Sequence, residues 1–221
     1  MIISIQDLKF AYQAPVLDIE KFEMQSSEKT FLQGPSGSGK STLLNLVSGV
    51  TQIQEGEIRI DGSDFSTLSS SKRDKIRGAK IGYIFQNFNL IPYLSVKENI
   101  ELPCTLSQRK PIKQTLEEES NYLIESLGLT PQKNQKVFQL SLGQQQRVAA
   151  ARALMGAPKL IIADEPTSSL DYDRAQDFMD LLFGLIEKNK LALLFVSHDD
   201  RLKDRFDRAV NLLDINRSYG Q

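Results

Sequence analysis

Gly34-Pro35-Ser36-Gly37-Ser38-Gly39-Lys40-Ser41-Thr42 is the segment of this 221-residue chain that gives the strongest indication of its fold. Residues 34–41 match the phosphate-loop pattern G-x-x-x-x-G-K-[ST]. The glycines let backbone N–H groups curl around an anion, and a helix that opens at Lys40 adds its positive dipole end. The alternative is a Gly/Ser-rich turn before a helix. A short apolar run before the loop and a helical leucine pattern after it favour the phosphate site.

The residue types of this loop indicate how it would hold a nucleotide. Lys40 would reach the β- and γ-phosphates, and the Ser41 hydroxyl would ligate Mg²⁺. The predicted nucleotide-binding set from the loop is Gly34, Pro35, Ser36, Gly37, Ser38, Gly39, Lys40, Ser41 and Thr42.

Composition restricts the classes of function. The chain has 27 basic and 28 acidic residues, a net charge of −1 and 40% hydrophobic residues. This balance gives no support for a nucleic-acid partner, and we expect none. Cys104 is the only cysteine, which excludes an internal disulfide and a cysteine-based zinc site. No apolar run approaches the length of about eighteen residues that a transmembrane helix requires, so we expect any membrane role to come through a partner.

Three segments, two before the loop and one after it, have the pattern of antiparallel strands. Residues 2–12 and 16–24 alternate apolar with polar side chains, as half-buried strands do, and residues 57–60 read as another short strand before a turn. Tyr12 ends the first strand, where an aromatic ring could stack on a purine. A surface tyrosine at a strand end is the equally simple alternative.

Three unbroken apolar runs, residues 81–85, 160–163 and 191–196, predict parallel strands buried on both faces. Ligands bind beyond the carboxyl ends of such strands, so the residues that follow each run are expected around the phosphates. They are Gln86, the pair Asp164 and Glu165, and His198.

The polar residues at these strand ends divide by chemistry. Asp164 is placed to help hold Mg²⁺, and Glu165 to polarise the water that attacks the γ-phosphorus. His198, the only histidine, could contact the γ-phosphate. The alternatives are a helix N-cap for the acidic pair and a structural role for the histidine.

A second informative stretch, residues 140–155, begins Leu-Ser-Leu-Gly-Gln. Ser141 with Gln144 three residues later forms a capping box, while Gly156 and Pro158 end the helical pattern, so a helix begins within a residue of Leu142. Such a start is a candidate second anion site. An ordinary well-capped helix is the alternative.

The order of these motifs resembles the ATP-binding cassette family from Tyr12 to His198. The resemblance implies ATP and Mg²⁺ as cofactors and a head-to-tail homodimer in which each signature motif completes the partner's site. It also implies a role for each matching residue: Tyr12 stacks on adenine, Gln86 is the Q-loop glutamine, Ser141, Gly143 and Gln144 form the signature, Asp164 binds the metal with Ser41 and Gln86, Glu165 is the catalytic base, Asp171 is the D-loop aspartate and His198 is the switch histidine.

The expected fold is α/β. It is a P-loop NTPase with a mostly parallel core sheet, an N-terminal antiparallel β subdomain and a small helical subdomain. We expect a single domain over residues 1–221, with residues 1–86 and 158–221 as the catalytic core and residues 87–157 as the helical subdomain. A helical face at positions 116, 123, 124 and 127 predicts a helix within the latter. A further strand is expected over residues 208–213, and the short remainder argues against an appended domain.

Residues 85–103 are similar to the lipoprotein-releasing and macrolide-efflux branch of the family. Five apolar side chains there are expected to line a groove for a helix of an integral membrane permease, unless they form the subdomain core: Phe88, Leu90, Ile91, Tyr93 and Leu94. The predicted function is therefore an ATP-hydrolysing subunit, cytoplasmic and peripheral on the inner face of the cell membrane, that drives a separate permease.

Two alternatives from other classes stay open at this point. One is a mechanotransmitting ATPase of the cell-division type, which moves no cargo. The other is a non-transport cytosolic ATPase acting on nucleic acid or ribosomes, which the near-neutral charge disfavours. Cargo specificity in this family belongs largely to the membrane subunit, so the sequence assigns no cargo.

Leu142 departs from the family pattern, which usually has glycine at this position. Leucine is allowed in a helical turn, so the Gly143 N–H should still face a phosphate, but the larger side chain would crowd the dimer seam. We predict that Leu142→Gly hydrolyses ATP faster than the parent in a phosphate-release assay at saturating ATP. Equal or faster hydrolysis by the parent would contradict this prediction.

Overall fold

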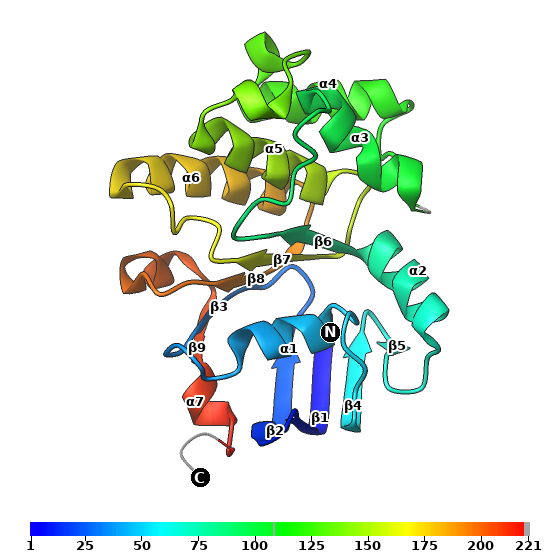
Figure 1. The fold of residues 1–221 in the computed structure, drawn as a ribbon, viewed down its shortest axis with the longest axis vertical. Coiled ribbons are helices and arrows are strands. Elements are labelled where there is room, and N and C mark those ends of the chain that lie inside the picture. The colour runs from blue at the N-terminus through cyan, green and yellow to red at the C-terminus, as the bar shows by residue number, and fades with distance from the viewer. Residues whose placement is uncertain (108, 219–221) are drawn as a thin grey trace.

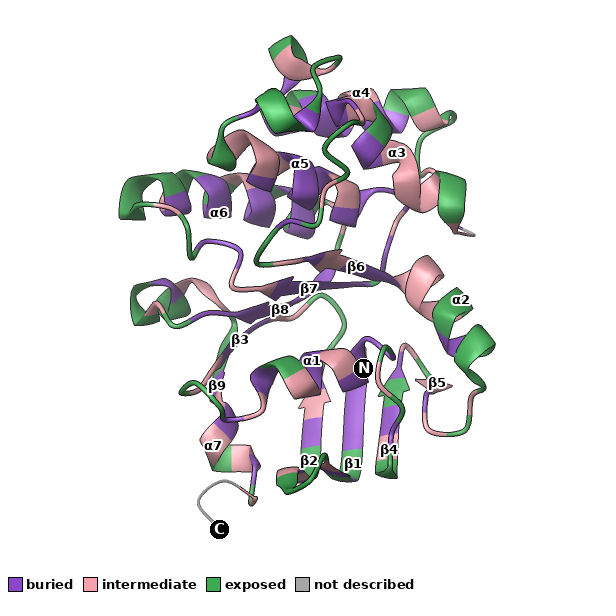
Figure 2. Cartoon of the chain, in the orientation of Figure 1, coloured by how far each residue is buried: buried purple, intermediate pink, exposed green. Residues whose placement is uncertain are grey.

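The computed structural model describes residues 1–107 and 109–218, which form two sheets with a helix between them. Helix α1 (Lys40–Val47) lies between the sheets, and α5 and α6 cover the opposite face of the larger sheet, with α3 and α4 beyond them (Figure 1). This layered arrangement leaves the larger sheet buried on both faces (Figure 2).

The antiparallel sheet has the strand order β2-β1-β4-β5. Its strands are β1 (Ile3–Ala11), β2 (Pro15–Met24), β4 (Glu55–Ile60) and β5 (Ser63–Asp64). Along β1 the side chains of Ile3, Ile5, Leu8 and Phe10 are buried, so the predicted alternation holds on either side of a break at Asp7, whose φ is 48°. The register of β1 on β2 shifts between Phe10 and Ala11, directly before Tyr12.

The parallel sheet has the strand order β6-β7-β8-β3-β9, and every pair in it is parallel. Its strands are β3 (Lys29–Gln33), β6 (Ile81–Ile84), β7 (Leu160–Asp164), β8 (Ala192–Val196) and β9 (Arg208–Asn211). The strand expected over residues 208–213 is shorter than predicted. The Asn211 carboxamide accepts the Leu213 N–H at 3.1 Å and starts α7 (Leu212–Ile215).

The remaining helices are α2 (Ser70–Lys80), α3 (Val96–Leu106), α4 (Leu116–Ser126), α5 (Leu142–Leu154) and α6 (Tyr172–Lys188). Capping boxes start α3, α4 and α5, and the one at Ser141 and Gln144 confirms the predicted start of α5. Short 3₁₀ turns cover Thr130–Gln132, Val137–Gln139 and Asp200–Arg205.

Two hydrophobic cores hold the layers together. Alternate residues of the parallel strands face opposite cores: Ile161 packs with α3–α6, whereas Ile162 packs with α1 and the antiparallel sheet. Helix α5 lies so close to β6 that a Cβ on Gly82 would sit 2.1 Å from the Ala153 carbonyl oxygen. Glycine at this position therefore brings the signature helix against the strand that leads to Gln86.

Within the described residues, no helix combines the length and the apolar character needed to cross a bilayer.

Candidate functional site

The phosphate loop connects β3 to α1 and is held in shape by its glycines and Lys40. Gly37 and Gly39 have φ of 80° and 99°, in the left-handed region that favours glycine. A Cβ on Gly39 would lie 2.8 Å from the Leu17 Cδ2. Lys40 is buried and its ammonium donates hydrogen bonds to the Gly34 and Pro35 carbonyl oxygens at 2.6 and 3.0 Å. These bonds turn the carbonyl groups toward the lysine.

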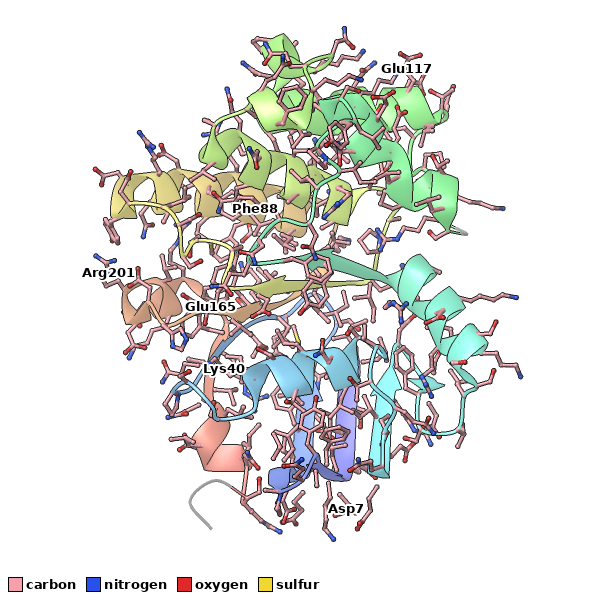
Figure 3. The ribbon with its side chains drawn as sticks, viewed as in Figure 1. Asp7, Lys40, Phe88, Glu117, Glu165 and Arg201 are labelled. Atoms are coloured by element: carbon pink, nitrogen blue, oxygen red, sulfur yellow. The ribbon has the colours of Figure 1, made fainter. Side chains whose placement is uncertain are left out.

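A cavity of about 260 Å³ opens over this loop. It is lined by Val16, Ser36, Gly37, Gly39, Lys40, Ser41, Thr42, Glu165 and His198. Figure 3 shows Glu165 and Lys40 near one another, where the parallel strands end above α1. The fold therefore brings the loop to the same cavity as two of the residues predicted from strand ends.

Glu165 is the centre of the side-chain contacts at this edge of the sheet. Its Oε1 lies 2.6 Å from the His198 Nε2, and its Oε2 accepts a hydrogen bond from the Gln86 Nε2 at 3.3 Å. The three residues follow β6, β7 and β8, which are neighbours in the sheet. These distances bring together three of the residues expected at the strand ends, and their roles at a nucleotide stay a prediction.

The backbone of Glu165 adopts a conformation that the sequence did not indicate. Its φ is 46°, in the left-handed region, which costs a non-glycine residue about 1 kcal/mol. The Glu165 N–H donates to the Val196 carbonyl at 2.9 Å, and the Glu165 carbonyl accepts from the Ser168 N–H at 3.2 Å. These bonds hold the chain in a sharp bend that directs the carboxylate toward His198.

Charge and burial oppose each other around Lys40. Burial raises the pKa of the Asp164 carboxyl and the nearby Glu165 charge raises it further, whereas Lys40 lowers it. Burial lowers the pKa of Lys40, and the charges of Glu165 and Asp164 partly restore it. An added cation would stabilise the ionised form of Asp164. The hydroxyl of Ser41, the amide of Gln86 and the carboxylate of Asp164 are oxygen donors of the kind that Mg²⁺ accepts.

The signature residues lie at the start of α5 and outside the described lining of the phosphate-loop cavity. The Ser141 Oγ accepts the Gln144 N–H at 3.4 Å, and the Gln144 Oε1 accepts the Ser141 N–H at 2.9 Å. Leu142 is 56% exposed, and a Cβ on Gly143 would meet no atom within 4 Å. The helix start is therefore open to a ligand or another molecule.

Tyr12 and Asp171 are also outside the described lining of this cavity. Tyr12 is 66% exposed and packs edge-on against Phe10, with ring centroids 5.0 Å apart. Asp171 caps α6 by accepting the Arg174 N–H at 3.0 Å, and its carboxylate pairs with the Arg174 guanidinium at 3.2 Å. Both residues face outward in a single copy of the chain.

The apolar residues expected in a docking groove separate into two groups. Phe88 is 5% exposed and belongs to the core, so the expectation that it lines a groove is wrong. Its backbone turns left-handed, with φ of 58°, and carries the ring inward. Leu90 packs partly against the same core. Ile91 and Tyr93 are exposed, and Leu94 is half-buried.

Arg152 is a site residue that sequence reasoning missed. Its guanidinium donates to the Phe88 and Asn89 carbonyl oxygens, both at 2.6 Å. Asn89 is also left-handed, with φ of 47°, so the arginine holds two consecutive strained residues just after Gln86. Burial lowers the pKa of Arg152. The only signal in the sequence is an arginine within the alanine-rich part of α5, and local pattern cannot identify its partner.

Gln146 makes a second connection from α5. Its side chain is fully buried, and its Nε2 donates to the Pro166 carbonyl at 2.6 Å. The signature helix is thus bonded both to the segment after Gln86 and to the segment after Glu165.

Comparisons with known proteins agree with this geometry. The family model described as "ABC transporter" matches residues 17–168. The chain is 40% identical over 200 residues to the lipoprotein-releasing system ATP-binding protein LolD of Anaeromyxobacter dehalogenans, covering 90% of this chain and 83% of that protein. It is 36% identical over 203 residues to the macrolide export ATP-binding/permease protein MacB of Rhodopirellula baltica, covering 92% of this chain and 30% of that protein.

A solved structure gives the same result for the fold. The ATP-binding cassette MJ0796, in a dimeric post-hydrolysis state bound to ADP and Pi, superposes with a TM-score of 0.85 at 34% identity. The match covers 95% of this chain and 94% of that one.

We predict that Arg152→Lys loosens the segment after Gln86. A single ammonium cannot bond both carbonyl groups in the fork geometry of arginine, and a charged hydrogen bond contributes about 1.5–3 kcal/mol. Hydrogen exchange of the peptide covering residues 86–94 is expected to become faster. Arg147→Lys on the same helix is the control, because Arg147 donates to the Leu127 carbonyl, at 3.5 Å, and this bond does not involve the segment after Gln86. Unchanged exchange in Arg152→Lys would refute the role of the arginine.

Proposed function

The chain is an ATPase of the ABC transporter family, and from that premise we propose how its residues bind and hydrolyse ATP. Gly34 to Thr42 surround the phosphates with backbone N–H groups, and Lys40 exchanges its bonds to the Gly34 and Pro35 carbonyls for bonds to phosphate oxygens. Tyr12 provides an exposed ring for adenine stacking. The cavity over the loop supports this assignment, because the loop residues and Glu165 line it together.

We infer that Ser41, Gln86 and Asp164 hold Mg²⁺ with oxygen atoms of the phosphates. Among the described residues no group of three or more His, Cys, Asp or Glu side chains could hold a metal ion. This fits an ion that keeps water and phosphate ligands and takes few from protein. When bound, Mg²⁺ neutralises charge on the phosphates during transfer.

Glu165 is proposed as the general base of hydrolysis. A water held by its carboxylate attacks the γ-phosphorus, the water's proton passes to the carboxylate, and the bond to the ADP oxygen breaks. His198 and Gln86 fix the two carboxylate oxygens by contacts of 2.6 and 3.3 Å, which supports a precise orientation. The left-handed backbone of Glu165 adds a further constraint on that orientation.

We propose that two copies form a head-to-tail homodimer around ATP. In one copy the helix start at Ser141 and Gly143 is open and lies away from the described lining of the phosphate-loop cavity. A second copy would bring that helix start, with the Ser141 hydroxyl and the Gly143 N–H, to the γ-phosphate. Asp171, exposed at the start of α6, would lie at the seam. The dimeric state of the solved cassette supports this arrangement.

The dimer is proposed to drive an integral membrane permease from the inner face of the cell membrane. The similarity to LolD and MacB favours the lipoprotein-release or export branch. The docking surface is proposed at the exposed side chains Ile91 and Tyr93, with half-buried Leu94 and Leu90 beneath. A neighbouring groove of about 310 Å³ includes Asn89 and Arg152, so a bound helix would touch the segment after Gln86.

We predict that Glu165→Gln abolishes turnover while ATP binding is kept, because the amide cannot accept the proton. The trapped ATP should hold the dimer together, which size-exclusion chromatography with ATP and Mg²⁺ detects as a doubled mass. Glu125→Gln, at an exposed glutamate of α4, is the matched control and should hydrolyse ATP like the parent. Normal hydrolysis by Glu165→Gln would show that Glu165 is not the general base.

The docking surface is tested by photo-crosslinking. A photoreactive residue at Tyr93 is expected to capture an integral membrane protein in membranes of the source organism. The same residue at Leu106, which is also 77% exposed, is the control and should capture none. Equal capture from both positions, or capture from Leu106 alone, would place the partner elsewhere.

A further inference from the structure

Asn216 ties together two parts of the molecule that are distant in sequence. It follows α7 and is 4% exposed. Its Nδ2 donates to the Val16 carbonyl at 2.9 Å and to the Ser38 carbonyl at 3.2 Å. Its Oδ1 accepts the Asp18 N–H at 2.9 Å and both the N–H and the hydroxyl of Ser218 at 3.2 and 2.8 Å. Both donors of the carboxamide are therefore used.

The groups held by Asn216 belong to β2 and to the phosphate loop. Val16 and Asp18 lie on β2, which is an edge strand, and Ser38 lies in the loop itself. The loop has little room at this place. A Cβ on Gly39 would be 3.3 Å from the Val16 carbonyl oxygen, and one on Gly34 would be 3.4 Å from the Leu212 Cβ. The loop is thus packed between β2 and α7, with Asn216 bonded to both β2 and the loop.

The bond to Ser38 controls the direction of one peptide group. In a trans peptide the C=O of one residue and the N–H of the next point in opposite directions. A Ser38 carbonyl bonded to Asn216 therefore turns the Gly39 N–H to the opposite side. Gly39 lines the cavity over the loop, whereas Asn216 is outside its described lining. The outward carbonyl and the inward N–H are the arrangement that a phosphate requires.

The backbone freedom of Gly37 and Gly39 makes the hydrogen bond from Asn216 to Ser38 necessary. Gly37 and Gly39 allow the loop to curl, but the same residues allow the peptide between Ser38 and Gly39 to rotate. Lys40 donates to the Gly34 and Pro35 carbonyls and not to the Ser38 carbonyl. Among the described residues, the Ser38 carbonyl accepts its hydrogen bond from Asn216. A loop that populates its binding conformation only in part binds its ligand more weakly by that fraction.

We propose that Asn216 is a positioning residue of the nucleotide site, which keeps the Gly39 N–H directed at the phosphates without touching the nucleotide. The inference rests on the proposed binding of ATP at residues 34–42. It differs from a purely structural role, in which Asn216 would only fasten α7 to β2. The two roles separate by experiment, because only the first changes nucleotide affinity at constant fold.

Asn216→Asp is the main test. It keeps the volume and the acceptor for Asp18 and Ser218, but places an oxygen in the position from which Asn216 donates to Val16 and Ser38. The Kd for ATP, measured by fluorescent-nucleotide displacement, is expected to rise about tenfold, as loss of a hydrogen bond and repulsion between oxygens predict. KM should rise in parallel, and kcat at saturating ATP should change by less than about twofold, because bound ATP restores the loop.

Asn211→Ala is the matched control. It removes the cap of α7 at the Leu213 N–H and leaves the bond to Ser38 in place. It should lower the free energy of unfolding by about 1 kcal/mol with an unchanged Kd. Asn216→Ala removes the donors without adding charge, and it should also weaken ATP binding when circular dichroism shows a native fold.

The outcomes are distinguishable. A Kd in folded Asn216→Asp and Asn216→Ala within twofold of the parent would overturn the proposal. Failure of both variants to fold, with Asn211→Ala folded, would assign Asn216 to stability alone and also overturn it. If the parent itself bound no ATP, the result would contradict the proposed ATPase function and not only the role of Asn216.

Discussion

Burial of the parallel sheet on both faces is the constraint on which the rest of the structure depends. Strand β8 is apolar along its whole length and β7 is apolar up to its last residue, Asp164, so both are stable only between two hydrophobic layers. Their polar residues are therefore confined to the strand ends, and in a parallel sheet the carboxyl ends share one edge. The same burial that stabilises the fold thus places Glu165 and His198 at one cavity with Lys40, and Gln86 reaches this edge through its hydrogen bond to Glu165.

The connections from this edge explain how a site made of loops keeps its shape. Two segments at this edge are held by side chains of α5: Arg152 holds the left-handed pair after Gln86, and Gln146 holds Pro166. Asn216 does the same for the phosphate loop from the opposite side. Helix α5 also carries the signature at its start. A change at that start can therefore be passed through these hydrogen bonds to the segments that follow Gln86 and Glu165.

Sequence and structure agree where local rules decide. Period-two alternation identified β1 and β2, unbroken apolar runs identified β6–β8, and the capping box at Ser141 identified the start of α5. The meeting of Glu165 with His198 followed from topology. The left-handed backbone of Glu165, the burial of Phe88 and the bonds of Asn216 did not, since each depends on contacts between residues far apart in the chain. Such contacts leave no pattern in the local sequence from which they could be predicted.

We propose that each nucleotide is shared, with the loop of one copy and the signature of its twin at the same site. Mixing two inactive variants tests it most directly. Lys40→Ala lacks a working loop and Ser141→Arg lacks a working signature, so each alone forms dimers with two defective sites. A mixed dimer would contain one intact site, with Lys40 from one copy and Ser141 from the other. A shared site requires that ATPase activity reappears when the two variants are combined. A mixture as inactive as its components, beside an active parent, would contradict it.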